Sequence, residues 1–252
     1  MGVVSHAVSE DGGLHTITLD GPPGNVIDIA MCAELQAELE SAAAAHEAKV
    51  LVVAGAGDNF CFGASVEEHL PDKAREMLAA LGGVLRTLVG FPYPTLAAVQ
   101  GRCLGGGFEL ALACGLIIAE ESAVLGSPEI RLGVLAPAAT ALLTGRVAED
   151  VLLTGRDLSA AEAHRLGIVT AIAAEGALGE TVADYVDQFF RPRSAASLRI
   201  ATKAVRSSRV AAFEKRLAEA ERIYTEELLA LHDGTEGIRA FIEKRPPAWR
   251  NA

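Results

Sequence analysis

The stretch from Thr95 to Ala138 constrains the fold most, because it joins a buried strand, three consecutive glycines and an apolar helix. Residues 96–99 (LAAV) form a short apolar run that is typical of a buried strand. The glycines at 105–107 follow, and glycines allow unusual backbone dihedrals and the close approach of another group. A helix that begins there leaves unpaired N–H groups at its positive end. The sequence therefore predicts a place where developing negative charge can be held.

Two glutamates lie in the same stretch. Glu109 falls in the first turn of the expected helix, and Glu129 follows Pro128 in the segment GSPEI. Two carboxylates beside oriented N–H donors are suited to moving protons next to an oxyanion. Each feature alone also has a simpler interpretation. Glycines mark tight turns, a first-turn glutamate complements the helix dipole, and Glu129 can be a surface residue after a turn.

The remaining periodicity predicts a mixed α/β fold. Residues 14–19 alternate apolar and polar side chains, as in a strand, and the apolar run 50–55 indicates a buried strand. Helical patterns cover 27–46 and 70–89 and resume from 107, and the apolar segment 151–155 (VLLTG) is expected to be strand-like. Strands and helices thus recur along the chain, and periodicity alone indicates nothing finer than α/β.

The last sixty residues differ in character. Residues 191–252 are highly charged and helical in pattern, with almost no strand signals. Leu217, Ile223, Leu228 and Leu231 keep helical spacing. Apolar stripes of this kind do not distinguish a helical cap on the chain's own domain from a surface that contacts other subunits.

Length, charge and cysteine usage exclude several classes of protein. At 252 residues the chain can form one large domain, or one domain with an appendage. No apolar run is long enough to span a bilayer, and the N-terminus lacks a signal-peptide pattern. Four cysteines without metal-ligand spacing indicate reduced thiols in a cytoplasmic protein with no metal site. A net charge of −11 argues against a nucleic-acid partner.

The two glutamate segments, GRCLGGGFELALAC and LGSPEIRLGVLAPAA, resemble the crotonase (enoyl-CoA hydratase/isomerase) superfamily. The resemblance extends over nearly the whole chain, to AFIEKRPPAW near its end. It implies an α/β spiral of repeated β-β-α units over residues 1–190, which holds an acyl-CoA site. It also implies a C-terminal helical oligomerisation region over 191–252, and a trimer or a dimer of trimers. No cofactor is expected, because coenzyme A is part of the substrate.

The resemblance assigns roles to particular residues. Matching the family's F-x-x-G-A segment onto Phe60–Ala64 places one oxyanion-hole N–H at Ala64, and the glycine run places the second at Gly106. Ser65 stands where many members have Asp, which alters the support of the loop rather than the N–H donor. Glu109 and Glu129 are 20 residues apart, as in hydratases, where two carboxylates hold and split a water molecule.

A finer resemblance involves FCFGASVEEHLPD, NVIDIAM, LGVLAPAA and residues 227–249 (ELLALHDGTEGIRAFIEKRPPAW), which look most like the cyclohexa-1,5-dienecarbonyl-CoA hydratases of benzoyl-CoA degradation. Those enzymes add water to a conjugated cyclic dienoyl-CoA and form 6-hydroxycyclohex-1-ene-1-carbonyl-CoA. Cys61, Phe62 and Leu70 are then expected to line the ring pocket, although core packing is the commoner role of such residues. Lys244, with Arg245 second, is expected to bind the nucleotide end of coenzyme A.

One segment departs from the family pattern. The chain is short around 142–150, which is expected to change the pocket but not the glutamates. Beyond it, Ser159 and Glu162 form a capping-box pattern, and Gly167 marks the end of that helix. Alternative functions are a general short-chain 2-enoyl-CoA hydratase, an enoyl-CoA isomerase, and a noncatalytic RNA-binding protein with this fold. The acidic balance and the presence of both glutamates argue against RNA binding.

Overall fold

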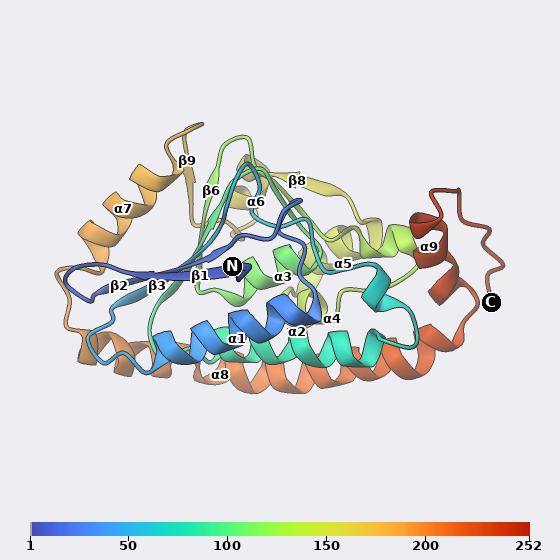
Figure 1. Cartoon of the computed structure of the whole chain (residues 1–252), viewed down its shortest axis with the longest axis horizontal. Helices are drawn as coiled ribbons and strands as arrows, with labels where there is room; N and C mark the ends of the chain where they lie inside the picture. Colours follow the sequence, from blue (N-terminus) through green and yellow to red (C-terminus); the bar gives the residue numbers. More distant parts are fainter. Residues whose placement is uncertain (1) are drawn as a thin grey trace.

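The computed structural model describes residues 2–252 and contains two sheets surrounded by helices (Figure 1). The larger sheet has the strand order β1-β2-β3-β4-β6-β9. Only the β1–β2 pair is antiparallel. Its strands are β1 (Val4–Val8), β2 (Leu14–Leu19), β3 (Val50–Gly55), β4 (Thr95–Val99), β6 (Leu116–Glu120) and β9 (Ala171–Ala173). The smaller sheet comprises β5 (Arg102–Leu104), β7 (Val124–Gly126) and β8 (Asp157–Ser159).

The helices account for most of the remaining chain. The α-helices are α1 (Ile29–Ala43), α2 (Ala74–Val89), α3 (Gly106–Ala113), α4 (Pro137–Leu142), α5 (Gly145–Thr154), α6 (Ala160–Arg165), α7 (Leu178–Phe189), α8 (Ala195–Arg222) and α9 (Asp233–Ile242). The short helical turns are η1 (Glu67–His69), η2 (Pro128–Leu132), η3 (Ile223–Glu227) and η4 (Leu228–Ala230), of which η3 has π-helical geometry. No helix within residues 2–252 has both the length and the apolar character needed to cross a bilayer.

The central strands are apolar on both faces, because helices cover both sides of the larger sheet. Leu51 and Val53 face the main core, which α1, α2 and α3 help to form. Val50 and Val52 face the opposite way and pack with residues of α7. A parallel sheet covered on both faces needs continuous apolar strands, and β3 and β4 have this pattern.

Most sequence-based predictions of elements are confirmed. The strands at 14–19 and 50–55 have the predicted bounds. The helix predicted from 70 begins only at Ala74, because Pro71 forces Leu70 into an extended conformation. The strand-like segment predicted at 151–155 is wrong, since it is the last turn of α5 and ends at Gly155 with φ +63°. A short apolar run cannot distinguish a strand from a buried helix segment.

Helix α8 runs along the base of the molecule and joins the C-terminal region to the rest of the chain (Figure 1). It packs against α2 and α4, and its Phe213 and Leu217 belong to the same core as the strands. The predicted N-cap of α6 is confirmed, because the Ser159 hydroxyl oxygen accepts a hydrogen bond from the Glu162 N–H at 3.2 Å. The division into residues 1–190 and 191–252 stays a prediction.

Candidate active site

The N-terminus of α3 is the centre of the candidate site. Gly105 has φ +52°, and a Cβ atom there would lie 2.7 Å from Glu129 Oε1. Only glycine fits this conformation and this close approach without strain. Gly106 is the first helical residue, so its N–H points out of the helix instead of bonding within it.

A second loop brings another N–H beside it. Gly63, with φ +119°, turns the backbone ahead of Ala64. The Ala64 nitrogen is 3.1 Å from the position that a Cβ atom on Gly106 would occupy. Within residues 2–252, neither the Ala64 nor the Gly106 N–H donates to a protein acceptor. The two loops therefore present two free amide donors side by side.

Glu109 lies in the first turn of α3 with only 4% of its surface exposed. Its Oε1 accepts hydrogen bonds from the N–H groups of Ala138 (2.8 Å) and Ala139 (2.9 Å), at the start of α4. Burial, followed by the charge of Glu129, raises the pKa of Glu109 to about 8, and the two amide bonds oppose that rise. A carboxyl group with this pKa keeps its proton at neutral pH.

Glu129 lies in η2, where Pro128 occupies the first turn. Its Oε2 accepts a 2.6 Å hydrogen bond from the Ser127 hydroxyl. Burial raises the pKa of Glu129 above its ordinary value, and the Ser127 hydrogen bond opposes the shift. Because the two carboxyl groups interact, they titrate as a pair and retain one proton between them over part of the pH range.

A cavity of about 100 Å³ joins these groups. Ala64, Gly106, Glu109 and Glu129 all line it. Its other walls are mostly apolar and are formed by Phe62, Val66, Leu78, Leu81, Leu132, Val134, Leu135, Pro137 and Ile238, together with His69. Two carboxyl groups and two free amide donors thus face one small apolar cavity, which suits proton transfer next to a developing oxyanion.

Of the three residues predicted to line the ring pocket, one lies at the cavity and two do not. Phe62 lines the cavity and is 43% exposed. Cys61 is fully buried beneath the loop, where its sulfur accepts a hydrogen bond from the Gly63 N–H, and burial raises the pKa of its thiol to about 12. Leu70 packs into a neighbouring apolar cluster with Tyr224. Neither Cys61 nor Leu70 is part of the cavity wall.

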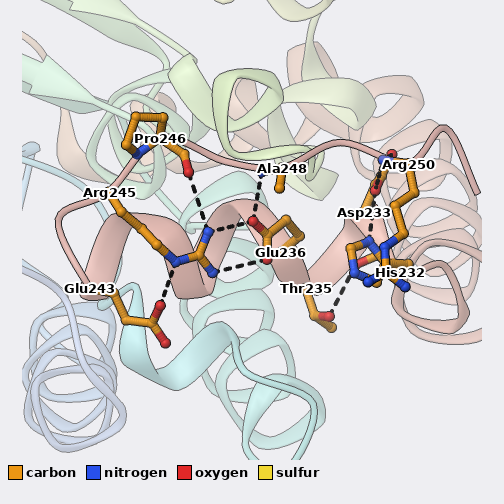
Figure 2. A network of polar contacts seen from close by, with 9 residues as sticks. All are labelled: His232, Asp233, Thr235, Glu236, Glu243, Arg245, Pro246, Ala248 and Arg250. Atoms are coloured by element: carbon orange, nitrogen blue, oxygen red, sulfur yellow. Dashed lines mark hydrogen bonds and ion pairs between the residues drawn. The ribbon is translucent and has the colours of Figure 1, made fainter.

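Lys244 and Arg245, the two residues predicted to bind coenzyme A, differ in their ion pairing. Lys244 is exposed at the end of α9, and its ammonium group forms no ion pair with another described residue. Arg245 is held by Glu236 and Glu243, with contacts of 2.5 Å to Glu236 Oε1 and Glu243 Oε2 (Figure 2). Of the two, Lys244 is therefore the one available to a phosphate group.

Sequence reasoning missed two polar residues near the site. His69 lines the cavity, its Nδ1 is 2.7 Å from the Ser65 carbonyl oxygen, and burial lowers its pKa. Tyr224, on η3, is fully buried, and its hydroxyl group has no hydrogen-bond partner among residues 2–252. Burial and the charges of Glu129 and Glu109 raise the pKa of Tyr224. Only the fold brings η3 to the carboxylates, so no local pattern could have indicated this residue.

Comparison with known proteins places these features in one family. The enoyl-CoA hydratase/isomerase family model matches residues 9–252. The chain is 40% identical over 248 residues to the cyclohexa-1,5-dienecarbonyl-CoA hydratase of Thauera aromatica, covering 97% of this chain and 95% of that protein. It is 32% identical to a probable enoyl-CoA hydratase of Bacillus subtilis (strain 168), covering 99% of each.

The fold agrees with this assignment. The crystal structure of an enoyl-CoA hydratase from Mycobacterium avium subsp. paratuberculosis K-10 superimposes with a TM-score of 0.85, at 25% identity and 98% coverage of both chains. The predicted crotonase-type α/β fold with C-terminal helices is thereby confirmed. The chain belongs to the enoyl-CoA hydratase/isomerase family and is an enzyme of the hydro-lyase type.

Proposed function

We propose that this protein adds water to a conjugated cyclic dienoyl-CoA, converting cyclohexa-1,5-diene-1-carbonyl-CoA into 6-hydroxycyclohex-1-ene-1-carbonyl-CoA. The observation that carries the hydration chemistry is the placement of Glu109 and Glu129 opposite two free amide donors in one cavity. The ring specificity is supported by the 40% identity to a hydratase named for that substrate.

The proposed reaction uses the amide donors to hold the thioester oxygen. As hydroxide adds to the diene, electrons move through the conjugated system onto this oxygen, and the N–H groups of Ala64 and Gly106 stabilise the enolate. Donors of this kind contribute about 3–4 kcal/mol each in other enzymes. Because both donors are backbone groups fixed by the turn at Gly63 and by α3, they need no reorganisation during the reaction.

The carboxyl pair supplies the proton transfers. One carboxylate removes a proton from water, whose oxygen forms the new C–O bond. The other, neutral carboxyl group donates a proton to the ring carbon as the enolate collapses. The pair must therefore begin each cycle with one proton between its two members. The raised pKa values of Glu109 and Glu129 favour this state near neutral pH.

The binding of coenzyme A and the assembly are part of the same proposal. Lys244 is the cation proposed for the nucleotide end, since its ammonium group forms no ion pair within residues 2–252 and the chain as a whole is acidic. Phe62, exposed at the edge of the cavity, is proposed to contact the acyl or pantetheine portion. Assembly as a trimer or a dimer of trimers is proposed from the family resemblance, and a cytoplasmic location from the cysteine usage.

A general short-chain 2-enoyl-CoA hydratase is the second candidate, favoured by the 32% identity to the Bacillus subtilis protein. The test is to compare kcat/KM for cyclohexa-1,5-diene-1-carbonyl-CoA and crotonyl-CoA in water labelled with ¹⁸O, with products identified by mass spectrometry. A preference for the cyclic substrate with one labelled oxygen incorporated supports the proposal. A preference for crotonyl-CoA supports the second candidate, and rearrangement without oxygen incorporation indicates an isomerase.

A further inference from the structure

Helix α8 places arginines against the C-terminal ends of four other helices. Arg199, Arg206, Arg209 and Arg216 donate hydrogen bonds to carbonyl groups at or just beyond the ends of α1, α2, α3 and α4, respectively. The last carbonyls of a helix have no partner within it, and cations there also offset the negative end of its dipole. One long helix thus anchors four others, and the last of them contacts the active site.

Arg216 is the arginine that acts on α4. Its Nη2 donates to the carbonyl oxygens of Thr140 (2.5 Å) and Leu143 (2.8 Å). Helix α4 has only six residues, and a helix this short is not stable without outside contacts. Its opposite end carries the Ala138 and Ala139 N–H groups that bind Glu109 Oε1.

We propose that Arg216 is a positioning residue for the reaction, because by holding the C-terminal carbonyls of α4 it keeps the Ala138 and Ala139 N–H groups directed at Glu109 Oε1. The amide hydrogen bonds favour the ionised form of Glu109, so loosening α4 weakens them and strengthens proton binding at this carboxyl group. Arg216 thereby controls proton release from Glu109 across the length of one short helix.

Three other titratable groups, those of Glu129, Glu221 and Tyr224, lie around the Glu109 carboxyl. Glu129 on η2 and Glu221 on α8 both raise its pKa through their negative charges. Tyr224 on η3 is held neutral by burial and by the same carboxylates. Glu221 is paired with Arg86 at 2.9 Å, so its charge is partly compensated. Replacing Arg216 leaves these groups in place, and Arg216→Lys also keeps the positive charge of the side chain, so a shift seen in both variants reports the α4 amides.

The test compares Arg216→Met and Arg216→Lys with Arg199→Met as the matched control. Arg199 binds a carbonyl beyond α1, a helix that carries no residue of the candidate site. The first readout is the pH titration of the Glu109 carboxyl by ¹³C NMR, with its resonance assigned by its loss in Glu109→Gln. The second is the pH at which kcat falls on the alkaline side, and the third is thermal stability.

Arg216→Met is expected to raise the pH of Glu109 titration by about 0.5–1 unit, a threefold to tenfold change in proton affinity. Arg216→Lys, which has one ammonium group in place of the guanidinium fork, is expected to shift it less, and Arg199→Met not at all. The alkaline limb of kcat should move in the same direction. If Arg216→Met does not fold, the pH of Glu109 titration in Arg216→Lys is the test of the proposal.

An unchanged Glu109 titration in a folded Arg216 variant, with only the stability loss seen in Arg199→Met, would overturn the proposal. The inference about catalysis rests on the proposed role of Glu109, whereas the NMR titration needs no turnover. Full hydration activity in Glu109→Gln would therefore reject the proposed catalytic role of Glu109 and leave the control of its titration by Arg216 measurable on its own.

Discussion

Two groups of carboxylates in this chain contain the same residue types and have opposite properties. Glu109 and Glu129 face a cavity, neither forms an ion pair with a cation in the described part of the chain, and burial raises the pKa of both. Glu236 and Glu243 bind the guanidinium of Arg245 near the C-terminus (Figure 2). Hydrogen bonds from Arg245 and from the Ala248 N–H lower the pKa of Glu236 to about 2.

The difference shows that partners, not residue type, decide what a carboxylate can do. Glu236 is ionised throughout the ordinary pH range, and its hydrogen bond to the Ala248 N–H at 2.7 Å fixes the C-terminal tail. Glu109 holds a proton that it can release near neutral pH, because it lacks a cation and is buried. The first arrangement stabilises structure, and the second supports proton transfer at some cost in stability.

The largest expected effect comes from neutralising each carboxylate of the cavity. Glu109→Gln and Glu129→Gln should each lower the rate of hydration by roughly 100- to 10,000-fold, because each removes one general acid–base group. Steady-state kinetics with the preferred acyl-CoA measure the loss, and calorimetry should show that the thioester still binds. The control is Glu236→Gln, which should keep near-normal kcat. Full activity in either active-site variant would contradict the two-carboxylate mechanism.

The next effect concerns the amide donors beside the buried pair. Gly106→Pro removes one N–H at the first helical position, where proline is tolerated, and should lower kcat by about 100- to 1,000-fold. Gly106→Ala keeps the N–H and reports the steric effect alone, because its added Cβ atom would lie 3.1 Å from both the Cβ and the nitrogen of Ala64. Near-wild-type rates in a folded Gly106→Pro variant would place the oxyanion site elsewhere.

The contributions of Glu109 and Glu236 to folding stability should also change with pH in opposite directions. Glu109 binds its proton more tightly when folded, so its contribution to stability is complete below its ordinary pKa of 4.5 and disappears as pH rises through about 8. Glu109→Gln should therefore be more stable than wild type at pH 9, by on the order of a few kcal/mol in the free energy of unfolding. Urea denaturation at pH 6 and pH 9 measures this difference.

For Glu236, the change of stability with pH has the opposite sign. Its pKa is lowered in the folded state, so its contribution to stability is present above pH 4.5 and is lost as pH falls toward about 2. Glu236→Gln should be less stable than wild type at pH 7, and the difference should shrink in acid. A Glu236→Gln variant with wild-type stability at every pH would show that the Arg245 cluster does not stabilise the tail.

The smallest effect is expected at Lys244, the unpaired cation beside the Arg245 cluster. Lys244→Ala should raise KM for the CoA thioester by about twofold to fivefold with little change in kcat, as expected for one exposed charge. The increase should diminish at high salt, which screens exposed charges. Lys203→Ala, which removes an exposed lysine of α8, is the control. An unchanged KM at low ionic strength would assign Lys244 to the solvated surface.

The sequence by itself determined the local features of this protein. Apolar runs and alternation indicated strands β2, β3 and β4, and the glycine run placed Glu109 in the first turn of α3. These features depend on neighbouring residues and on backbone dihedrals, so a linear reading can recover them. The family resemblance then predicted roles for Ala64 and Gly106, whose backbone groups carry no side-chain signal.

Only the tertiary structure decided how the carboxylates are held. Ala138 and Ala139 reach Glu109 across about thirty residues of chain, and Tyr224 approaches from η3, more than a hundred residues away. The tertiary structure also places Cys61 outside the cavity wall, because its side chain is fully buried and its sulfur accepts a hydrogen bond from the Gly63 N–H. Burial and hydrogen bonding between distant segments set the pKa values, and no pattern of neighbouring residues encodes them.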